Sequence, residues 1–248
     1  MLRGPQLDTL RSAYRASMRL SDDRGWQHWA GIHGLPLPMY CQHHTPLFLA
    51  WHRAYLYYFE LSLKEFEPTV TLPWWDWTSS WSHQVGFPVA YTVAEAGGGP
   101  NPLAGGPINA LAVQQGGAGA PSHTSRSPGH PADLPTAAQI NGLLALGDFL
   151  DFQQQLESVH DEVHVWSGGT MQEIPYAAYD PIFFAHHCMI DRVWYLWQVQ
   201  NGADNFPSEL LDLPLTPFGK TPRDVLNVQA LGYEYAASAS PVPLEGPQ

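Results

Sequence analysis

The amino-acid sequence predicts a mainly α protein with a helical bundle core, long loops and few short strands. Three observations carry this prediction. Apolar residues recur at helical spacing in several segments. Residues typical of helix starts and ends flank those segments. Stretches rich in proline and glycine, without apolar periodicity, lie between them.

Three helices are expected in the first part of the chain. The first covers residues 7–20, where apolar side chains fall on one stripe. A short helix through "GWQHWAGIH" should end before Gly34, because glycine suits the position after a helix. Three prolines argue against regular helix in residues 34–46. Helical spacing then returns over residues 47–66.

The middle and the end of the chain have a different composition. Residues 97–135 are rich in Gly, Pro, Ala and Ser and predict a long surface loop. This loop separates two halves without requiring two domains, so residues 1–248 are expected to form a single catalytic domain. The tail, residues 236–248, is expected to be frayed.

Three more helices are expected after this loop. Thr136 and the glutamine three residues later form the pattern of a capping box, which opens a helix. A longer helix is predicted over residues 148–166, followed by two glycines. The Asp180-Pro181 pair supplies an N-cap and a first-turn proline for a helix that runs to about residue 200.

Composition and charge restrict the partners. The 248 residues carry a formal charge of −12. Binding to nucleic acid or to an anionic membrane needs concentrated Lys and Arg, so neither partner is expected. No signal-peptide pattern and no apolar run of membrane-spanning length occurs, which predicts a cytoplasmic location, with export alongside a partner left open. Cys41 and Cys188 are too few to build a disulfide framework.

Histidines that share a helix face are the first indication of chemistry. His160 and His164 lie four residues apart on a predicted helix, so both imidazoles point to one side, as a divalent metal site requires. Asp161 follows His160, so the H-E-x-x-H pattern of zinc proteases is not matched. Taken alone, two solvated histidines would explain this pair equally well.

A second pair, His186 and His187, lies inside a predicted helix that is otherwise apolar. Buried polar groups need partners, and a metal ion is one candidate. A hydrogen bond to Asp191, four residues after His187, is the other.

The stretch "GIHGLPLPMYCQHHTPLFLAWHRAYL", residues 31–56, contains four more histidines. His43 and His52 are nine residues apart and would face opposite ways in one continuous helix. They converge only if His43 lies in the loop before Pro46 and His52 on the following helix. His33 is a third candidate, at the end of the short helix. Three histidines from each half would give two triads, each able to hold a metal ion.

The ligand types indicate the metal. Imidazoles without carboxylate or thiolate ligands favour copper over magnesium, calcium or an iron–sulfur cluster. A single three-histidine zinc site is the competing interpretation, but it leaves half of these histidines unexplained. The residues therefore favour a dinuclear copper site in the helical core.

These motifs resemble those of the tyrosinase family of type 3 copper proteins, which includes catechol oxidases and molluscan haemocyanin units. The matching stretches, in the family's order, are "GIHGLP", "YCQHHTPLFLAWHRAYL", "LPWWDWT", "HDEVHVWSGG" and "DPIFFAHHCMIDRVW". "GYEY" at 232–235 resembles the Tyr-x-Tyr motif that closes the catalytic domain, for which Arg3 is the candidate partner. The resemblance spans about residues 7–235.

The resemblance implies two copper ions, each held by three histidines. The first triad would be His33, His43 and His52, and the second would be His160, His164 and His187. His28 is the alternative to His33, while family spacing favours His43 over His44 and His187 over His186. The other histidines are expected at the surface or beside the site.

Further residues gain roles from the same resemblance. In some members a thioether joins a Cys-x-His cysteine to the second histidine of the first copper site, and Cys41 has that spacing from His43. Phe183 is expected to stack near the substrate ring and Ile174 to line the pocket.

Two acidic residues are expected to handle protons. The resemblance places Glu157 near the first histidine of the second site, where it would hold a water beside the phenol. Asp161 stands where the family has an Asn that helps to hold this water. Because an ionised Asp only accepts hydrogen bonds, we expect the water to be oriented differently and phenol deprotonation to be harder.

The function implied by the resemblance is oxidation of o-diphenols to o-quinones by dioxygen, with some ortho-hydroxylation of monophenols. Such a protein is a copper oxidoreductase of the tyrosinase, catechol oxidase or polyphenol oxidase type, and in part a monooxygenase. The expected partners are a phenolic small molecule, dioxygen and a copper-delivery protein. The alternatives are an o-aminophenol oxidase and, less favoured because no added blocking domain is seen, a haemocyanin-like oxygen carrier.

Overall fold

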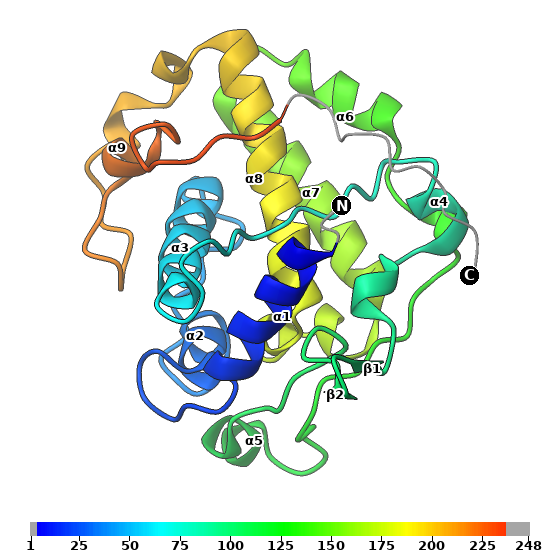
Figure 1. Ribbon diagram of the computed structural model, residues 1–248. Helices are drawn as coiled ribbons and strands as arrows, with labels where there is room; N and C mark the ends of the chain where they lie inside the picture. Colours follow the sequence, from blue (N-terminus) through cyan, green and yellow to red (C-terminus); the bar gives the residue numbers. More distant parts are fainter. Residues whose placement is uncertain (1–3, 237–248) are drawn as a thin grey trace.

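The computed structural model describes residues 4–236, and this part of the chain is mainly α, as the sequence predicts. Three long helices cross the middle of the molecule (Figure 1): α3 (Phe48–Lys64), α7 (Phe149–Ser167) and α8 (Ile182–Asn201). Helix α3 packs against both α7 and α8, and this packing forms the core of the bundle.

Shorter elements surround these three helices. The helices are α1 (Pro5–Ser17), α2 (Trp26–His33), α4 (Ser82–Val85), α5 (Ala110–Gly116), α6 (Ala137–Leu144) and α9 (Pro222–Val225). The strands β1 (Glu95–Ala96) and β2 (Gly99–Pro100) form one small antiparallel hairpin. Single turns of 3-10 helix are η1 (Val89–Tyr91), η2 (Pro131–Asp133), η3 (Gly169–Gln172), η4 (Ala177–Tyr179), η5 (Ala203–Asn205) and η6 (Ser208–Leu210).

The predicted capping box of α6 and the predicted glycine after α2 are confirmed, and α7 has a cap that was not predicted from the sequence. Thr136 and Gln139 form the capping box of α6. The Asp148 side chain accepts a hydrogen bond from the Asp151 N–H and so opens α7. Helix α2 ends at Gly34, where a Cβ atom would lie 2.2 Å from the Pro175 carbonyl oxygen, so only glycine fits. The end of α2 can therefore approach the segment before α8.

The 97–135 segment differs from the expected surface loop. It contains β2, α5 and η2, and it buries apolar side chains such as Leu103 and Ile108. The sequence did not indicate these elements, because a few buried residues spaced among glycines and prolines produce no apolar periodicity. The tail, residues 237–248, lies outside the described residues.

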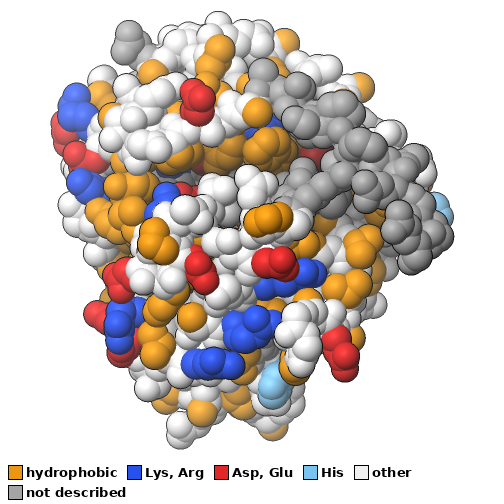
Figure 2. Space-filling view, in the orientation of Figure 1, with side chains coloured by type: hydrophobic (Ala, Val, Ile, Leu, Met, Phe, Trp, Pro, Cys, Tyr) orange, Lys and Arg blue, Asp and Glu red, His pale blue; other side chains and the backbone are white. Residues whose placement is uncertain are grey.

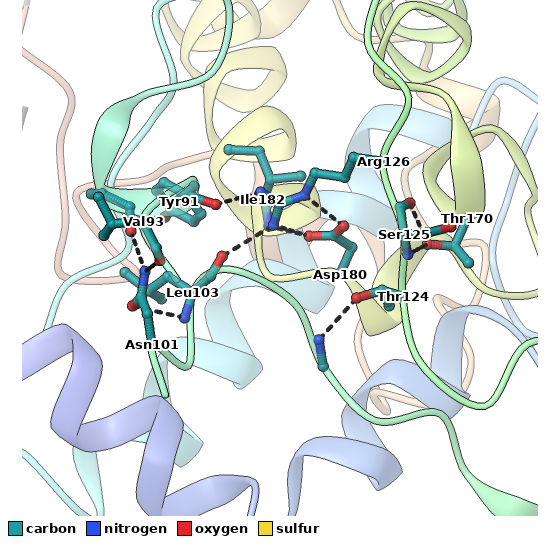
Figure 3. A network of polar contacts seen from close by, with 12 residues as sticks. Tyr91, Val93, Asn101, Leu103, Thr124, Ser125, Arg126, Thr170, Asp180 and Ile182 are labelled. Carbon is teal, nitrogen blue, oxygen red and sulfur yellow. Dashed lines mark hydrogen bonds and ion pairs between the residues drawn. The ribbon is translucent and has the colours of Figure 1, made fainter. Parts of the chain in front are cut away.

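Arg126 ties this segment to the start of α8 (Figure 3). Its guanidinium donates to both carboxylate oxygens of the buried Asp180 and to the carbonyl oxygens of Tyr91 and Leu103. Asp180 Oδ1 also accepts from the Ile182 N–H, which caps the first turn of α8. One arginine thus connects the long segment to the helix that carries His186 and His187.

A second buried ion pair joins α3 to α8. Arg53 Nε donates to Asp191 Oδ1 over 2.6 Å, and the guanidinium lies 3.6 Å from the centre of the Trp194 ring. The hydroxyls of Tyr233 and Tyr235 donate to the other oxygen of Asp191, at 2.8 Å each. Removing one partner of such a pair typically costs about 3–5 kcal/mol, because the other charge stays buried.

This network decides between the two partners that the sequence left open for the α8 histidines. Asp191 accepts from Arg53, Tyr233 and Tyr235, and among the described residues it makes no hydrogen bond to a histidine. Arg3, the candidate partner of the Tyr-x-Tyr motif, lies outside the described residues.

The surface is mixed in character. The face in Figure 2 carries apolar, acidic and basic side chains, and basic ones gather over α1, to which Arg11 and Arg15 belong. Within the described part of the chain, no helix has both the length and the apolar character needed to cross a membrane.

Candidate metal centre

Three elements bring the first group of histidines together. His33 is the last residue of α2, His52 lies in the second turn of α3, and His43 comes from the non-helical stretch between them. Their ring centroids are 5.1–5.7 Å apart. One nitrogen from each ring lies within 4.8 Å of the others, which is close enough to share a metal ion. His33 and His52 are buried, and His43 is partly buried.

The second group comes from α7 and α8. It contains His160, His164, His186 and His187, all of them buried and again within 4.8 Å of one another by one nitrogen each. The Nε2 atom of His187 lies 3.2 Å from that of His160 and 3.3 Å from that of His164. Two nitrogens bound about 2.0 Å from one tetrahedral metal ion would be about 3.3 Å apart.

Hydrogen bonds to the other ring nitrogen orient three of these imidazoles. The Nδ1 atoms of His52 and His164 face the carbonyl oxygens of Phe48 and Met171, at 2.8 and 2.6 Å. A carbonyl oxygen can only accept, so each Nδ1 carries the proton and each Nε2 presents a lone pair. His160 is fixed in the same way, by Asp161 Oδ1 at 2.9 Å from its Nδ1.

The lone pairs of His160 and His164 therefore both face the Nε2 atom of His187. At most one N–H of His187 could serve them, so a hydrogen bond cannot satisfy the whole cluster. A cation at the centre would satisfy all three nitrogens at once. This orientation of imidazoles by carbonyl and carboxylate acceptors is typical of metal sites in proteins.

Burial keeps the histidines uncharged. Desolvation lowers the pKa of His43 and of His164 from the usual value to about 4, and the neighbouring histidines reinforce the effect at His43. The pKa values of His33, His52, His160 and His187 are lowered further by the same burial. At neutral pH the rings are neutral, which is the form that binds a metal ion.

The two groups adjoin each other. The rings of His52 and His187 stack at 4.6 Å, and those of His43 and His160 lie 5.8 Å apart. Phe48 packs against both sides, 4.6 Å from His52 and 4.9 Å from His160. The arrangement fits two neighbouring metal ions with imidazole ligands, a donor set that suits copper.

The structure separates the histidines that the sequence left as alternatives. His28 and His44 are exposed and lie outside both groups. His186 is buried, and it stacks 5.2 Å from His160 without a hydrogen-bond partner for either ring nitrogen among the described residues. His123 and His130 are exposed at the surface, and His83 is partly buried against Pro135.

The expected pocket residues lie at different depths. Phe183 is fully buried, with its ring stacked 3.9 Å from His187 and 4.7 Å from His33. It therefore packs between the two histidine groups. Ile174 is 45% exposed, in the segment that contacts the end of α2.

The two acidic residues beside the cluster have different surroundings. Glu157 is buried, and its Oε1 accepts from the His44 backbone N–H at 2.6 Å. Desolvation raises the pKa of Glu157, and the charge of Asp161 adds to this effect. Asp161 is 44% exposed, and desolvation raises its pKa too. Sequence reasoning missed the contact of Asp161 with His160, although the two residues are adjacent.

A groove runs along the outer side of α7 next to the cluster. Its volume is about 580 Å³, and its lining residues are Asp133, Ser158, Asp161, Glu162, Val165 and Trp166. Asp161 belongs both to this groove and to the hydrogen bond that orients His160. The groove thus reaches to within one side chain of the histidine cluster.

Comparison with known proteins identifies the family and the fold. Residues 23–200 match the common central domain of tyrosinase. Grixazone synthase from Streptomyces griseus is 31% identical over 249 residues, which are 75% of this chain and 78% of that protein. Haemocyanin units G and H of Sepia officinalis are 29% identical over 260 residues, covering 93% of this chain and 44% of theirs.

The solved structures agree. A functional unit of octopus haemocyanin superposes with a TM-score of 0.80 at 28% identity, over 94% of this chain and 65% of that one. The chain spans less than half of the Sepia haemocyanin that it matches. The match to the central domain contains all seven buried or partly buried histidines of the two groups. The chain therefore belongs to the tyrosinase family of type 3 copper proteins, which bind two copper ions.

Proposed function

We propose that the protein is a dicopper oxidase that uses dioxygen to oxidise o-diphenols to o-quinones and that hydroxylates some monophenols. The two adjoining histidine groups in a chain of the tyrosinase family carry this proposal, and the groove beside Asp161 adds a surface for a small molecule. The groove volume of about 580 Å³ lies in the range of small-molecule sites, and one side chain separates the groove from the histidine cluster. A phenol held in the groove would lie on the Nδ1 side of His160, beside the ring that would bind the second copper ion.

The proposed ligands are the three histidines of the first group and three of the four in the second. His33, His43 and His52 would hold one copper ion, and His160, His164 and His187 the other. His187 is favoured over His186 because only its Nε2 lies within 3.3 Å of the Nε2 atoms of both α7 histidines.

Bound copper would supply the binding of dioxygen and the transfer of electrons. The chain's own residues orient the imidazoles and exclude water, since Phe183 and Phe48 fill the space around the two groups. A phenol has a pKa of about 10, so its hydroxylation requires a base nearby. Glu157, whose pKa burial raises, is the proposed acceptor of that proton at a carboxylate oxygen.

Oxygen transport is the alternative, since haemocyanins are among the proteins that resemble this chain at similar identity. A carrier would bind dioxygen reversibly and leave catechols unchanged. An oxidase would consume dioxygen in proportion to the quinone formed. Oxidation of o-aminophenols needs the same centre and is tested with the same assay.

The ligand assignment predicts different outcomes for the two neighbouring histidines of α8. Replacing His187 by Ala should lower the copper content from about two ions per chain to about one and abolish nearly all activity. Replacing His186 by Ala should leave two ions, because neither of its ring nitrogens is within hydrogen-bond contact of another histidine. Metal analysis of the purified, folded variants measures both. Loss of copper from the His186 variant alone would reverse the assignment.

The proposed proton handling predicts the ratio of monophenol to catechol turnover. Asp161→Asn should raise this ratio, because the Asn amide can donate as well as accept while its carbonyl oxygen still accepts from His160. Glu157→Gln should lower it, because the proton acceptor is lost. Initial rates on tyramine and dopamine, which carry the same charge, give the ratio at neutral pH. Should both variants keep the wild-type ratio, neither residue handles the proton.

Cys41 remains the proposed partner of His43 in a thioether. The structure records a free, partly buried thiol whose pKa burial raises to about 11. Closing the S–C bond removes one hydrogen from each residue, and dioxygen at the copper site would accept the two electrons and two protons. Copper loading in air should therefore lower the intact mass by about two hydrogens. Free alkylation of Cys41 in the copper-loaded protein would exclude the bond.

The charge around the groove predicts a preference among catechols. Residues 127–191 contain nine Asp and Glu and no Lys or Arg, and Asp133, Asp161 and Glu162 line the groove. A cleft lined by one sign of charge concentrates ligands of the opposite sign. Dopamine should therefore have a kcat/KM several-fold higher than that of 3,4-dihydroxyphenylacetate, and salt should reduce the difference.

Substitutions at the groove test this preference directly. Asp133→Asn with Glu162→Gln should narrow the difference between the two catechols, since both side chains are exposed in the groove. Glu209→Gln is the matched control, because Glu209 is an exposed acidic residue outside the groove. It should leave the difference between the two catechols unchanged. Equal selectivity in all three proteins at low salt would show that these charges play no part.

A further inference from the structure

His43 is the one proposed copper ligand that no helix carries. The other five belong to α2, α3, α7 and α8, whose positions are fixed by backbone hydrogen bonds and core packing. His43 lies in the stretch between α2 and α3, next to an exposed His44 that adopts a φ of +54°. A residue other than glycine in this left-handed region is held there at a cost of order 1 kcal/mol, so its surroundings must impose the conformation.

Two side chains of α7 hold this stretch. Glu157 Oε1 accepts from the His44 N–H at 2.6 Å, and Gln153 Nε2 donates to the Thr45 carbonyl oxygen at 3.0 Å. The two side chains are four residues apart, so they share one face of the helix. Both are buried, with 4% of each residue exposed. Glu157 accepts from the N–H of the first residue after His43, and Gln153 donates to the carbonyl oxygen of the second.

The same helix carries His160 and His164 of the second triad. A rigid α7 that grips the His43 stretch therefore sets the position of a ligand to one copper ion relative to the ligands of the other. The ring planes of His43 and His160 are inclined by 24° and their centroids are 5.8 Å apart, so one ligand from each triad stands beside the other.

We propose that Glu157 and Gln153 form a backbone clamp that positions His43 for copper binding, and that Glu157 does so as a hydrogen-bond acceptor. The clamp rests on the proposed assignment of His43 as a ligand. It gives Glu157 a structural task that is separate from proton transfer. That task requires an oxygen at the end of the side chain but no negative charge.

The matched pair of variants is Glu157→Gln and Glu157→Ala. Gln keeps an oxygen that can accept from His44 N–H, whereas Ala removes it. We expect the Gln variant to bind two copper ions with nearly wild-type affinity. In the Ala variant the weaker copper ion should bind about ten- to a hundredfold less tightly, which corresponds to leaving the His44 N–H without its acceptor. Competition with a chelator followed by metal analysis measures both affinities.

Gln153→Met tests the other half of the clamp without touching the acidic group. Met has a similar volume and no donor, so copper binding should weaken by about two- to tenfold, as for one neutral hydrogen bond. Gln155→Ala, an exposed position on the same helix, is the control and should bind copper as the wild type does. If Glu157→Ala does not fold, the Gln153→Met variant still tests whether the α7 side chains position His43 for copper binding.

Hydrogen exchange in the copper-free protein gives a reading that is independent of copper and of catalysis. The peptide that contains His44 should exchange faster in Glu157→Ala and in Gln153→Met, but at the wild-type rate in Glu157→Gln. Wild-type exchange and copper affinity in Glu157→Ala would overturn the clamp. Equal losses of copper affinity in Glu157→Gln and Glu157→Ala would also overturn it, because copper binding would then require the negative charge of Glu157 and not its hydrogen-bond acceptor. If the wild-type protein binds two copper ions but does not oxidise catechols, the proposed function is wrong, while the clamp is still tested by copper affinity and hydrogen exchange.

Discussion

The structure depends on holding uncharged imidazoles close together in the buried core of the helical bundle. Their ligating nitrogens have no protein partner that could satisfy all of them, as the three Nε2 atoms of His160, His164 and His187 show. Such a cluster is stable only when the elements that carry it are fixed by other interactions. The Arg53–Asp191 pair between α3 and α8, and the Arg126–Asp180 pair at the start of α8, supply two of these.

The acceptors around the cluster have a second effect. The carbonyl oxygens of Phe48 and Met171 belong to the backbone, so no substitution can remove them without moving the chain. Asp161 performs the same task for His160 with a side chain that is partly in solvent. Among the three histidines that these acceptors orient, His160 is therefore the one whose orientation a substitution can alter most easily. The residue that orients it, Asp161, also lines the groove.

The sequence predicted the long helices, several helix ends and the histidine groups because these depend on local patterns: helical spacing, Thr136 before a helix, Gly34 after one, and motifs in order. It left His28 and His33 as alternatives because both lie on the short helix, and only packing shows that His28 faces solvent. It did not reveal that the 97–135 segment buries Leu103, or that Gln153 bonds the stretch after His43. Those contacts join residues far apart in the chain and leave no periodic signal.

Oxidases and oxygen carriers of this family share the fold. The residues around the metal centre must therefore determine which of the two functions a member has. The relevant difference is whether a ring can approach the coppers, and this depends on side chains that bond no metal. In this chain Phe183 fills the space between the triads, while Asp161 and Val165 stand at the groove, partly or largely exposed. A bulky apolar side chain in place of Asp161 would narrow the groove and also release His160 from its acceptor. In the proposed oxidase, the shape of the groove and the orientation of His160 would therefore be coupled through Asp161, so a change that narrows the groove would also disturb the second copper site.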